Sequence, residues 1–572
     1  MTDPAAPALL LGPLLRYVDT HRATIWVETD RPCEVVVRVA GVEERSERTW
    51  TVHGHHFALV CLEGLSEGSE HAYEVLLDDG TVWPEPGSAF PPSVIRTFRH
   101  DESFRLSFGS CRRSAPMDAD HLKEVGADAL VALANRMMAG DHERWPDALY
   151  LAGDQVYADI PSPQQRARLL SQHGVDDEDD LDPKDPMTEV AAEIQNFEEY
   201  TWLYHDSWME PTVRWLLSTV PTAMILDDHD LRDDWNTSQE WRDRVTRTPW
   251  WRERVVGAFG SYWVYQHLGN LSPDELAQDR VYAMVRETAD DDERTRLLDE
   301  FAWEADAHPD SARWSFTRDF ASGEHQIRLV VIDSRCSRVL DPERRAMVDD
   351  VEWDWFSKQV LPDDGTRLDH LMIGSTLPVL LLPGIHHLEG WDEALARGRW
   401  GRWGQRFAEW LRQTVDLEHW SAFRTSFHRL MDLIARVGRQ ETPPSSVILL
   451  SGDVHCSYTA NARLDGVDPA RTGFHQLVMS PFRNPLEPPI RIANHLLNML
   501  PVRALLHWLA RRAGVEDAAV DWEVDHGMWF DNGVMTVVFH GGRAAVEVDH
   551  AHVRGGEQVL QRTHSQVLTP TG

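Results

Sequence analysis

The sequence predicts an α/β protein with an N-terminal fibronectin- or immunoglobulin-like β-sandwich, followed by a layered α/β domain with helical insertions. Three observations predict this fold class. The chain has 572 residues, which is too long for one small core. Up to about residue 98 it reads as short strands without helices, and after residue 101 strands alternate with long helical segments. Hydrophobic residues make up 42% and charged residues 26%, as in ordinary globular proteins.

Residues 8–100 are assigned to the β-sandwich. Runs of β-branched and aromatic residues alternate here with polar turns, which is typical of two packed antiparallel sheets. The region contains no cluster of catalytic side chains, so we expect it to support the second domain. The expected strands are 23–27, 33–39, 57–61, 73–77 and 94–98.

Residues 101–572 are assigned to the catalytic domain. Its apolar runs are separated by helical or irregular segments, and Gly541-Gly542 predicts a closing hairpin. Long insertions are expected at about 161–221, 378–445 and 485–520. The expected strands are 106–110, 148–152, 223–226, 327–332, 371–374, 447–450, 474–479, 534–539 and 544–548.

Four of these strands end in side chains of the types that bind metal ions in proteins. Ligands of α/β proteins lie outside the carboxyl ends of the strands, so we expect the four ends to meet at one site. Each residue alone has an ordinary explanation, such as a buried thiol, a hydrogen-bonded tyrosine or a turn cap. Their occurrence at four strand ends favours a metal site. The residues in question are Cys111, Asp154, Tyr157, Asp227 to Asp230, Asp453 and His455.

The order of these motifs resembles that of the PhoD-type alkaline phosphatases and phosphodiesterases, in the calcineurin-like metallophosphatase superfamily. The motifs are Ser110-Cys111, Gly153-Asp154-x-x-Tyr157, residues 227–230 and Gly452-Asp453-x-His455. The resemblance covers essentially the whole chain, because that family also carries a β-sandwich before its catalytic domain. It implies an αββα metallophosphatase domain and the hydrolysis of phosphomonoesters, phosphodiesters or both at alkaline pH.

The resemblance also implies a metal centre with one ferric iron and calcium, with other divalent metals as alternatives. Thiolate and phenolate suit a trivalent iron, and carboxylate oxygens suit calcium. Relatives often carry an acidic residue directly after the tyrosine, whereas this chain has Ala158 before Asp159, which puts calcium binding there in doubt. The implied metal ligands are Cys111, Asp154, Tyr157, Asp228, Asp453 and His455.

Two catalytic residues are expected beside the metals. His229 would face the phosphate, stabilising its charge or protonating the leaving oxygen. Arg112, or its neighbour Arg113, would bind the phosphate or else form a salt bridge. Trp391-Asp392 is expected at the site entrance and His386-His387 on a surface loop. Two alternative functions remain: a catalytically silent metal-binding scaffold, and a related metal-dependent hydrolase with a different ester or anhydride substrate.

The net charge of −37 disfavours a nucleic-acid groove, so we expect a small phosphorylated substrate. The sequence contains no apolar run long enough for a transmembrane segment, and the N-terminus lacks a secretory signal, so we expect a cytoplasmic protein. The acidic run 176–180 is expected as a solvated loop, with a calcium site as the alternative. The apolar segment 495–513, broken at Pro501, is either a lid over the active site or a membrane-interface helix.

Overall fold

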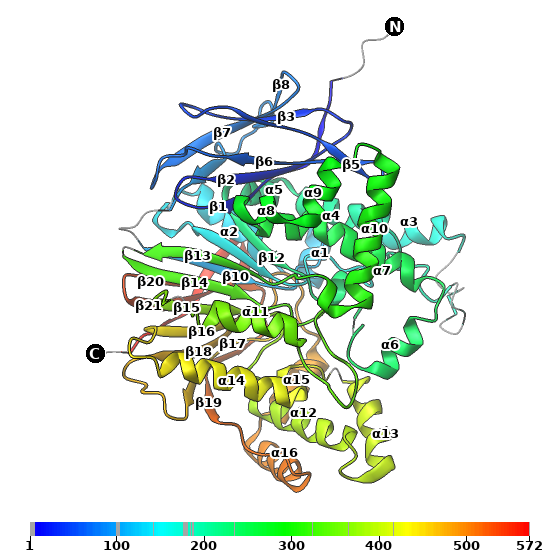
Figure 1. Cartoon of the computed structure of the whole chain (residues 1–572), viewed down its shortest axis with the longest axis vertical. Coiled ribbons are helices and arrows are strands. Elements are labelled where there is room, and N and C mark those ends of the chain that lie inside the picture. The colour runs from blue at the N-terminus through cyan, green and yellow to red at the C-terminus, as the bar shows by residue number, and fades with distance from the viewer. Residues whose placement is uncertain are drawn as a thin grey trace.

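The computed structural model of the chain consists of an N-terminal pair of sheets on top of a larger α/β domain (Figure 1). It describes residues 6–98, 103–140, 142–175, 181–182, 185, 188–233, 235–322, 324–363, 365–415 and 417–570. The acidic run 176–180 lies outside the described residues, so its expected role stays a prediction.

Two antiparallel sheets form the N-terminal sandwich. One has the order β1-β2-β6-β5 and the other β4-β3-β7-β8, with β9 also pairing with β7. Burial alternates along β3, as expected for a strand with one face on a core, whereas every residue of β2 is buried. The strands are β1 Leu9–Val18, β2 Ala23–Thr29, β3 Glu34–Val39, β4 Arg45–Arg48, β5 Trp50–Val52, β6 His55–Leu62, β7 Glu70–Leu77, β8 Gly80–Trp83 and β9 Val94–Arg96.

Strand β2 is buried on both faces because the sandwich packs directly on the catalytic domain. Arg16 is buried and donates hydrogen bonds to the carbonyl oxygens of Thr222, at 3.1 Å, and Tyr265, at 2.7 Å. Glu28 is also buried; its Oε2 lies 2.8 Å from His205 Nε2 and accepts from the Tyr265 hydroxyl at 3.0 Å. The sandwich therefore supports the catalytic domain through buried polar contacts.

The catalytic domain is built on two central sheets. The first has the order β12-β11-β10-β20-β21-β22; β10, β11 and β12 are parallel to one another, and β20 runs antiparallel to β10. The hairpin expected around Gly541-Gly542 is confirmed as β20 and β21. The strands are β10 Phe104–Gly109, β11 Ala148–Ala152, β12 Thr222–Ile225, β20 Gly533–His540, β21 Arg543–Arg554 and β22 Glu557–Val567.

The second central sheet has the order β13-β14-β15-β16-β18-β17-β19, in which β14, β15, β16 and β18 are parallel. Apolar side chains of the two sheets, such as Leu149 and Ile448, belong to one continuous core. The four motif strands are thus divided between the sheets, with β10, β11 and β12 in one and β16 in the other. The strands are β13 Phe316–Ser322, β14 His325–Val331, β15 His370–Gly374, β16 Ser446–Ser451, β17 Ser457–Leu464, β18 Gly473–Val478 and β19 Val520–Trp529.

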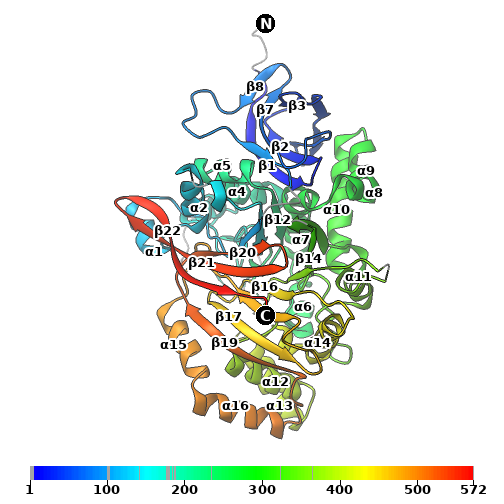
Figure 2. The same cartoon turned by 90° about the vertical axis from the view of Figure 1, so that its left-hand side faces the viewer.

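Helices cover the sheets and fill the expected insertions (Figures 1 and 2). Helices α3 to α5 lie in 161–221, α12 to α14 in 378–445, and α15 and α16 in 485–520. A further helical block, α6 to α10, was not anticipated from the sequence. The helices are α1 Ala119–Glu124, α2 Ala129–Met138, α3 Pro163–Gln172, α4 Phe197–Trp208, α5 Pro211–Thr219, α6 Gln239–Val245, α7 Trp251–Tyr262, α8 Pro273–Gln278, α9 Arg280–Glu287, α10 Asp291–Ala307, α11 Asp350–Val360, α12 Pro383–Ala396, α13 Gly401–Arg412, α14 Arg424–Gly438, α15 Pro488–Leu497 and α16 Leu500–Arg512.

The segment around His386-His387 corrects one expectation from the sequence. It is not a surface loop but part of α12, and His386 is buried. Asp392 is buried on the same helix. Pro383, in the first turn of α12, favours helix initiation there because that position needs no backbone N–H donor. Within the residues that the structure describes, no helix combines the length and the apolar character needed for a membrane span.

Candidate metal centre

The candidate ligands at the strand ends share an unusual backbone conformation. The φ angle is positive at Cys111 (56°), Asp154 (52°), Asp453 (65°) and His455 (47°). Non-glycine residues seldom adopt this left-handed conformation, because their side chain then crowds the backbone. Such strain persists where surrounding contacts enforce it, and it concentrates at functional sites. The turns after β10, β11 and β16 therefore hold a candidate ligand in this conformation, whereas Asp227 and Asp228, after β12, do not adopt it.

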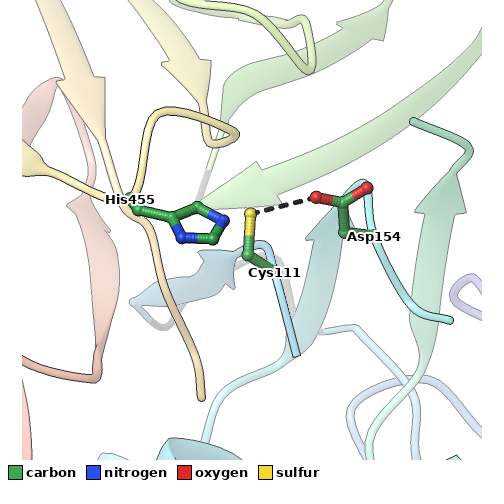
Figure 3. Close-up of side chains that lie close together, drawn as sticks. All are labelled: Cys111, Asp154 and His455. Atoms are coloured by element: carbon green, nitrogen blue, oxygen red, sulfur yellow. Dashed lines mark hydrogen bonds between the residues drawn. The ribbon is translucent and has the colours of Figure 1, made fainter. Parts of the chain in front are cut away.

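Cys111, Asp154 and His455 form the first cluster (Figure 3). Each offers one ligand atom, and the three atoms lie within 4.8 Å of one another. The Cys111 thiol donates to Asp154 Oδ2 at 3.2 Å, and the Tyr157 hydroxyl reaches the same oxygen at 3.5 Å. The Tyr157 hydroxyl also accepts from Asn484 Nδ2 at 3.1 Å. Four expected ligands from two different sheets thus surround one point.

Asp154 also belongs to a second cluster, with Asp228 and His229. A third cluster consists of Asp227, Asp228 and Asp453, and in each of the two the ligand atoms lie within 4.8 Å of one another. The structure therefore brings together all six ligands expected from the sequence. It adds Asp227, which belonged to the candidate run 227–230 but not to the six implied ligands.

The electrostatics of these clusters favour a bound cation. Burial, followed by the charge of Cys111, raises the pKa of Asp154 well above its usual value, and burial likewise raises the pKa of Asp227. Burial also raises the pKa of Cys111 to about 12 and lowers the pKa of His455 to about 4. Asp154 Oδ1 and Asp227 Oδ2 are buried and accept no hydrogen bond from any described residue. A cation would satisfy these oxygens and compensate the crowded charges, so the residues fit a metal centre.

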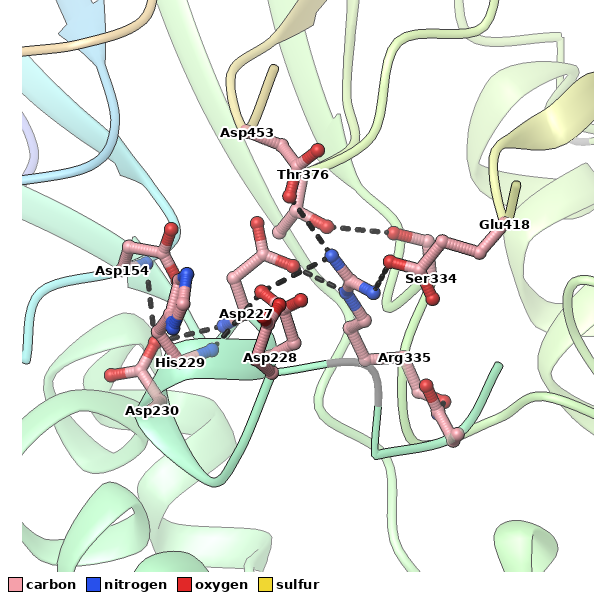
Figure 4. A network of polar contacts seen from close by, with 12 residues as sticks. Asp154, Asp227, Asp228, His229, Asp230, Ser334, Arg335, Thr376, Glu418 and Asp453 are labelled. Atoms are coloured by element: carbon pink, nitrogen blue, oxygen red, sulfur yellow. Dashed lines mark hydrogen bonds and ion pairs between the residues drawn. The ribbon is translucent and has the colours of Figure 1, made fainter. Parts of the chain in front are cut away.

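Arg335 lies behind the second and third clusters and was missed in the sequence analysis (Figure 4). It is fully buried, its Nη2 lies 2.9 Å from Asp453 Oδ1 and 3.3 Å from Asp228 Oδ1, and it also pairs with Asp227 and Glu418. Arg335 follows the expected strand 327–332 by three residues, in the sequence Asp-Ser-Arg. The available signal was a further polar cluster at a strand end. Asp333 is the only residue of a metal-binding type in that cluster, so nothing in the sequence singled out Arg335.

His419 is a second residue that sequence reasoning missed. Its Nε2 lies 3.5 Å from Asp453 Oδ2, and its Nδ1 lies 2.7 Å from Glu389 Oε1. Burial opposes protonation of His419, but Glu389 and Asp453 outweigh it and raise its pKa to about 10. No sequence signal distinguishes His419, because it lies outside the strand ends and reaches the site only through tertiary packing.

His229 is oriented by Asp159. Its Nδ1 lies 2.9 Å from Asp159 Oδ2, and its ring packs against that of Tyr157 with 4.6 Å between the centroids. Burial disfavours the charged imidazolium, but Asp159, together with Asp154 and Asp228, raises the pKa of His229 well above its usual value. These carboxylates therefore favour the protonated form of His229 next to the cluster, which is the form that a phosphate-binding or proton-donating role requires.

Arg112 does not join this group. Its Nε donates to Asp128 Oδ2 at 3.0 Å, and its Nη1 donates to the Ser207 carbonyl at 2.6 Å. The side chain is 2% exposed, and the guanidinium is held by a buried ion pair with Asp128 on one side and by the Ser207 carbonyl on the other. Of the two roles considered for Arg112, the structure thus supports the salt bridge, and we do not retain Arg112 as a phosphate ligand. Arg113 also pairs with an acid, lying 3.9 Å from Glu124.

Two family models match the chain. The model described as PhoD-like phosphatase matches residues 132–492, and one described as a domain of unknown function, DUF7800, matches residues 6–95. No curated protein matches.

The solved structures that the chain resembles include one titled "Structure of PhoD". The TM-score is 0.60 at 12% sequence identity, covering 100% of this chain and 92% of that one. A purple acid phosphatase from yellow lupin (Lupinus luteus) seeds gives a TM-score of 0.49 at 10% identity, covering 99% and 75% of the two chains. The first likeness confirms the sandwich followed by an α/β domain.

Proposed function

Because the chain belongs to the PhoD-like phosphatase family and is a metal-dependent phosphoesterase, we propose that it hydrolyses phosphate esters at the clusters described above. The observation that carries the proposal is the convergence of four strand ends from two sheets on a buried group of acidic, thiol and histidine side chains, in which Asp154 Oδ1 and Asp227 Oδ2 have no hydrogen-bond partner among the described residues. The proposed metal ligands are Cys111, Asp154, Tyr157, Asp228, Asp453 and His455.

The donor types suggest which metal each side of the site would hold. Cys111 and Tyr157 would hold a ferric iron, and Asp228 and Asp453 would hold calcium. Asp154 belongs to the clusters on both sides and would contact both ions. When bound, two such cations would supply Lewis-acid charge that neutralises the phosphate oxygens. Other divalent ions in the carboxylate cluster are a second candidate.

The side chains of the protein itself would orient the ester and supply a proton. Asp159 occupies His229 Nδ1, so Nε2 is the atom that would donate to the leaving oxygen. Arg335 and His419 would fix the carboxylates from behind without contacting the substrate. Asp159 raises the pKa of His229, so this imidazole keeps its proton to higher pH than an isolated histidine would. Chromogenic monoesters and diesters assayed side by side would define the substrate class.

Metal analysis of a Cys111→Ser variant tests the assignment, with Cys33→Ser as a matched control. Both thiols are buried, but Cys33 lies in the sandwich, far along the chain from the strand ends. We expect the wild type and Cys33→Ser to contain iron and to absorb visible light through charge transfer from the thiolate or phenolate. Cys111→Ser should lose iron, colour and phosphoesterase activity together.

Three outcomes would contradict the proposal. A colourless, iron-free wild type with full activity would exclude the ferric iron. Unchanged iron content in Cys111→Ser would remove the thiol from the ligand set. A wild type that holds its metals but hydrolyses none of the esters would support the silent scaffold or a hydrolase of another ester or anhydride instead.

A further inference from the structure

Helices α13, α15 and α16 form one end of the molecule, opposite the N-terminal sandwich. In both views α13 and α16 lie at the bottom of the molecule, where they flank α12, and α15 lies above α16 (Figures 1 and 2). The exposed apolar and arginine side chains of these three helices and of residues 397–400 are called the helical end face below. This face has no role in the proposed function.

The helical end face exposes large apolar side chains. On α13, Trp403 is 83% exposed and Trp410 is 59% exposed, and Phe407 lies between them on the same side of the helix. On α16, Leu500 is 78% exposed and Trp508 is 55% exposed. Both helices pack against α12, and several large exposed apolar residues on two such helices are unusual for a surface that contacts only water.

The same helices and residues 397–400 also carry arginines without ion-pair partners. Residues 488–513, which include α15 and α16, contain four arginines and no aspartate or glutamate. The chain as a whole carries a net charge of −37, so this face reverses the sign of the molecule locally. In this part of the molecule Arg397 and Arg412 pair with Glu393, and Arg511 pairs with Asp517. Six further arginines have no salt-bridge partner among the described residues: Arg399, Arg402, Arg406, Arg491, Arg503 and Arg512.

We propose that the helical end face binds the surface of an anionic phospholipid bilayer, with the helices lying in the interface rather than crossing it. Exposed tryptophan, leucine and isoleucine together with arginine are what interfacial helices use, the apolar groups entering the acyl boundary and the cations meeting lipid phosphates. A bilayer also suits the geometry, because the face lies at one end of the long axis (Figure 1).

Charge and burial distinguish the bilayer from two other partners of this face, a second copy of the chain and the active site of the chain itself. A symmetric dimer through this face would place arginine against arginine, because an isologous contact pairs each patch with itself. A lid role requires apolar side chains turned towards the protein, whereas α15 has no buried residue and α16 buries only Leu506 and Ala510. An anionic surface satisfies both the cations and the apolar groups.

Vesicle sedimentation tests the proposal with the full-length protein. We expect the wild type to sediment with vesicles that mix phosphatidylcholine and phosphatidylglycerol, weakly with phosphatidylcholine alone, and less as salt screens the charges. Replacing Arg402, Arg406 and Arg503 by Gln should weaken binding about 100-fold, since each basic residue near such a surface contributes about 1 kcal/mol. Replacing Trp403, Trp410 and Trp508 by Ser should abolish binding.

A matched control carries Val567→Ser and Arg344→Gln. Val567 is 56% exposed, but it lies on β22, away from the helical end face, and Arg344 is an exposed arginine paired with Asp341. The control should bind like the wild type, and all variants should keep the wild-type melting temperature and phosphoesterase activity in solution. Absence of sedimentation with mixed vesicles, equal binding to both lipids, or unchanged binding of the tryptophan variant would overturn the proposal. So would a dimer, seen by light scattering, that the tryptophan variant dissociates.

Discussion

Arg335 is a buried cation that pairs with the carboxylates of the candidate metal centre, and its replacement by Gln should destabilise the protein strongly. The guanidinium is fully buried and pairs with Asp227, Asp228, Glu418 and Asp453. Removing one partner of a buried ion pair leaves uncompensated charge and costs about 3–5 kcal/mol. We therefore expect Arg335→Gln, stripped of metal by a chelator, to lose that amount of unfolding free energy.

Metal should restore part of this loss. A cation bound by Asp228 and Asp453 would supply positive charge to the carboxylates that Arg335 no longer compensates. The difference in stability between wild type and Arg335→Gln should thus be smaller in the metal-loaded proteins than in the chelated ones. Adding Glu418→Gln should also recover stability, because the double variant has one buried negative charge fewer. For contacting residues such coupling amounts to about 0.5–3 kcal/mol.

Urea unfolding of the wild type, Arg335→Gln, Glu418→Gln and the double variant, each with and without metal, measures these quantities. Arg344→Gln serves as the control, because its pair with Asp341 is exposed and should contribute less than about 1 kcal/mol. An Arg335→Gln variant that unfolds like the wild type would refute the buried ion pairs. A stability deficit that is identical with and without metal would refute the coupling between Arg335 and the metal centre.

Four further results are expected. His229→Ala should lower kcat by about 10² to 10⁴-fold and leave the metal content unchanged. The loss should be smaller for nitrophenyl esters, because their leaving group needs little protonation. A loss of metal in this variant would instead make His229 a metal ligand. Asp159→Asn removes the partner that raises the pKa of His229, so the loss of kcat at alkaline pH should begin at lower pH than in the wild type. Selective chelation of calcium should stop turnover and leave the iron absorption in place, whereas surviving activity would exclude a catalytic calcium. Burial by itself would raise the pKa of Glu28, but His205 and His55 outweigh burial and lower that pKa. The Glu28 carboxylate therefore stabilises the fold at pH values above its pKa in the unfolded chain, and this stabilisation is lost as the pH falls through its pKa in the folded protein. Glu28→Gln should flatten that part of the curve of melting temperature against pH.

The strand ends were predictable from the sequence because their signal is local. An apolar run followed by glycine and a metal-binding side chain identifies both the strand and the position of the ligand, as at Asp154 and Asp453. The sequence could not show that these strands belong to two sheets. Strand pairing depends on contacts between distant segments, such as β10 with β20, whose paired residues Phe108 and Met535 are separated by most of the chain.

The residues missed at the site share a different property. Arg335 and His419 act on the candidate ligands only through tertiary contacts, and an arginine or histidine in a loop has many ordinary roles. Arg112 shows the converse, because its position next to Cys111 suggested phosphate binding while folding directs its guanidinium to Asp128. Adjacency in sequence therefore located the ligands at the strand ends but did not determine which cations reach them.

The boundary near residue 100 separates two patterns in the sequence, but it does not separate two independent cores. Apolar residues of the sandwich and of the first central sheet form one continuous cluster, in which the Trp26 and Tyr265 rings lie 5.2 Å apart. Arg16 donates to the carbonyl oxygen of Thr222 at the start of β12, the strand whose other end leads into Asp227 and Asp228. The sandwich therefore holds one of the four strands that carry the candidate ligands. Its contribution to the metal centre is positional, because it fixes β12 from the side opposite the ligands without supplying any ligand itself.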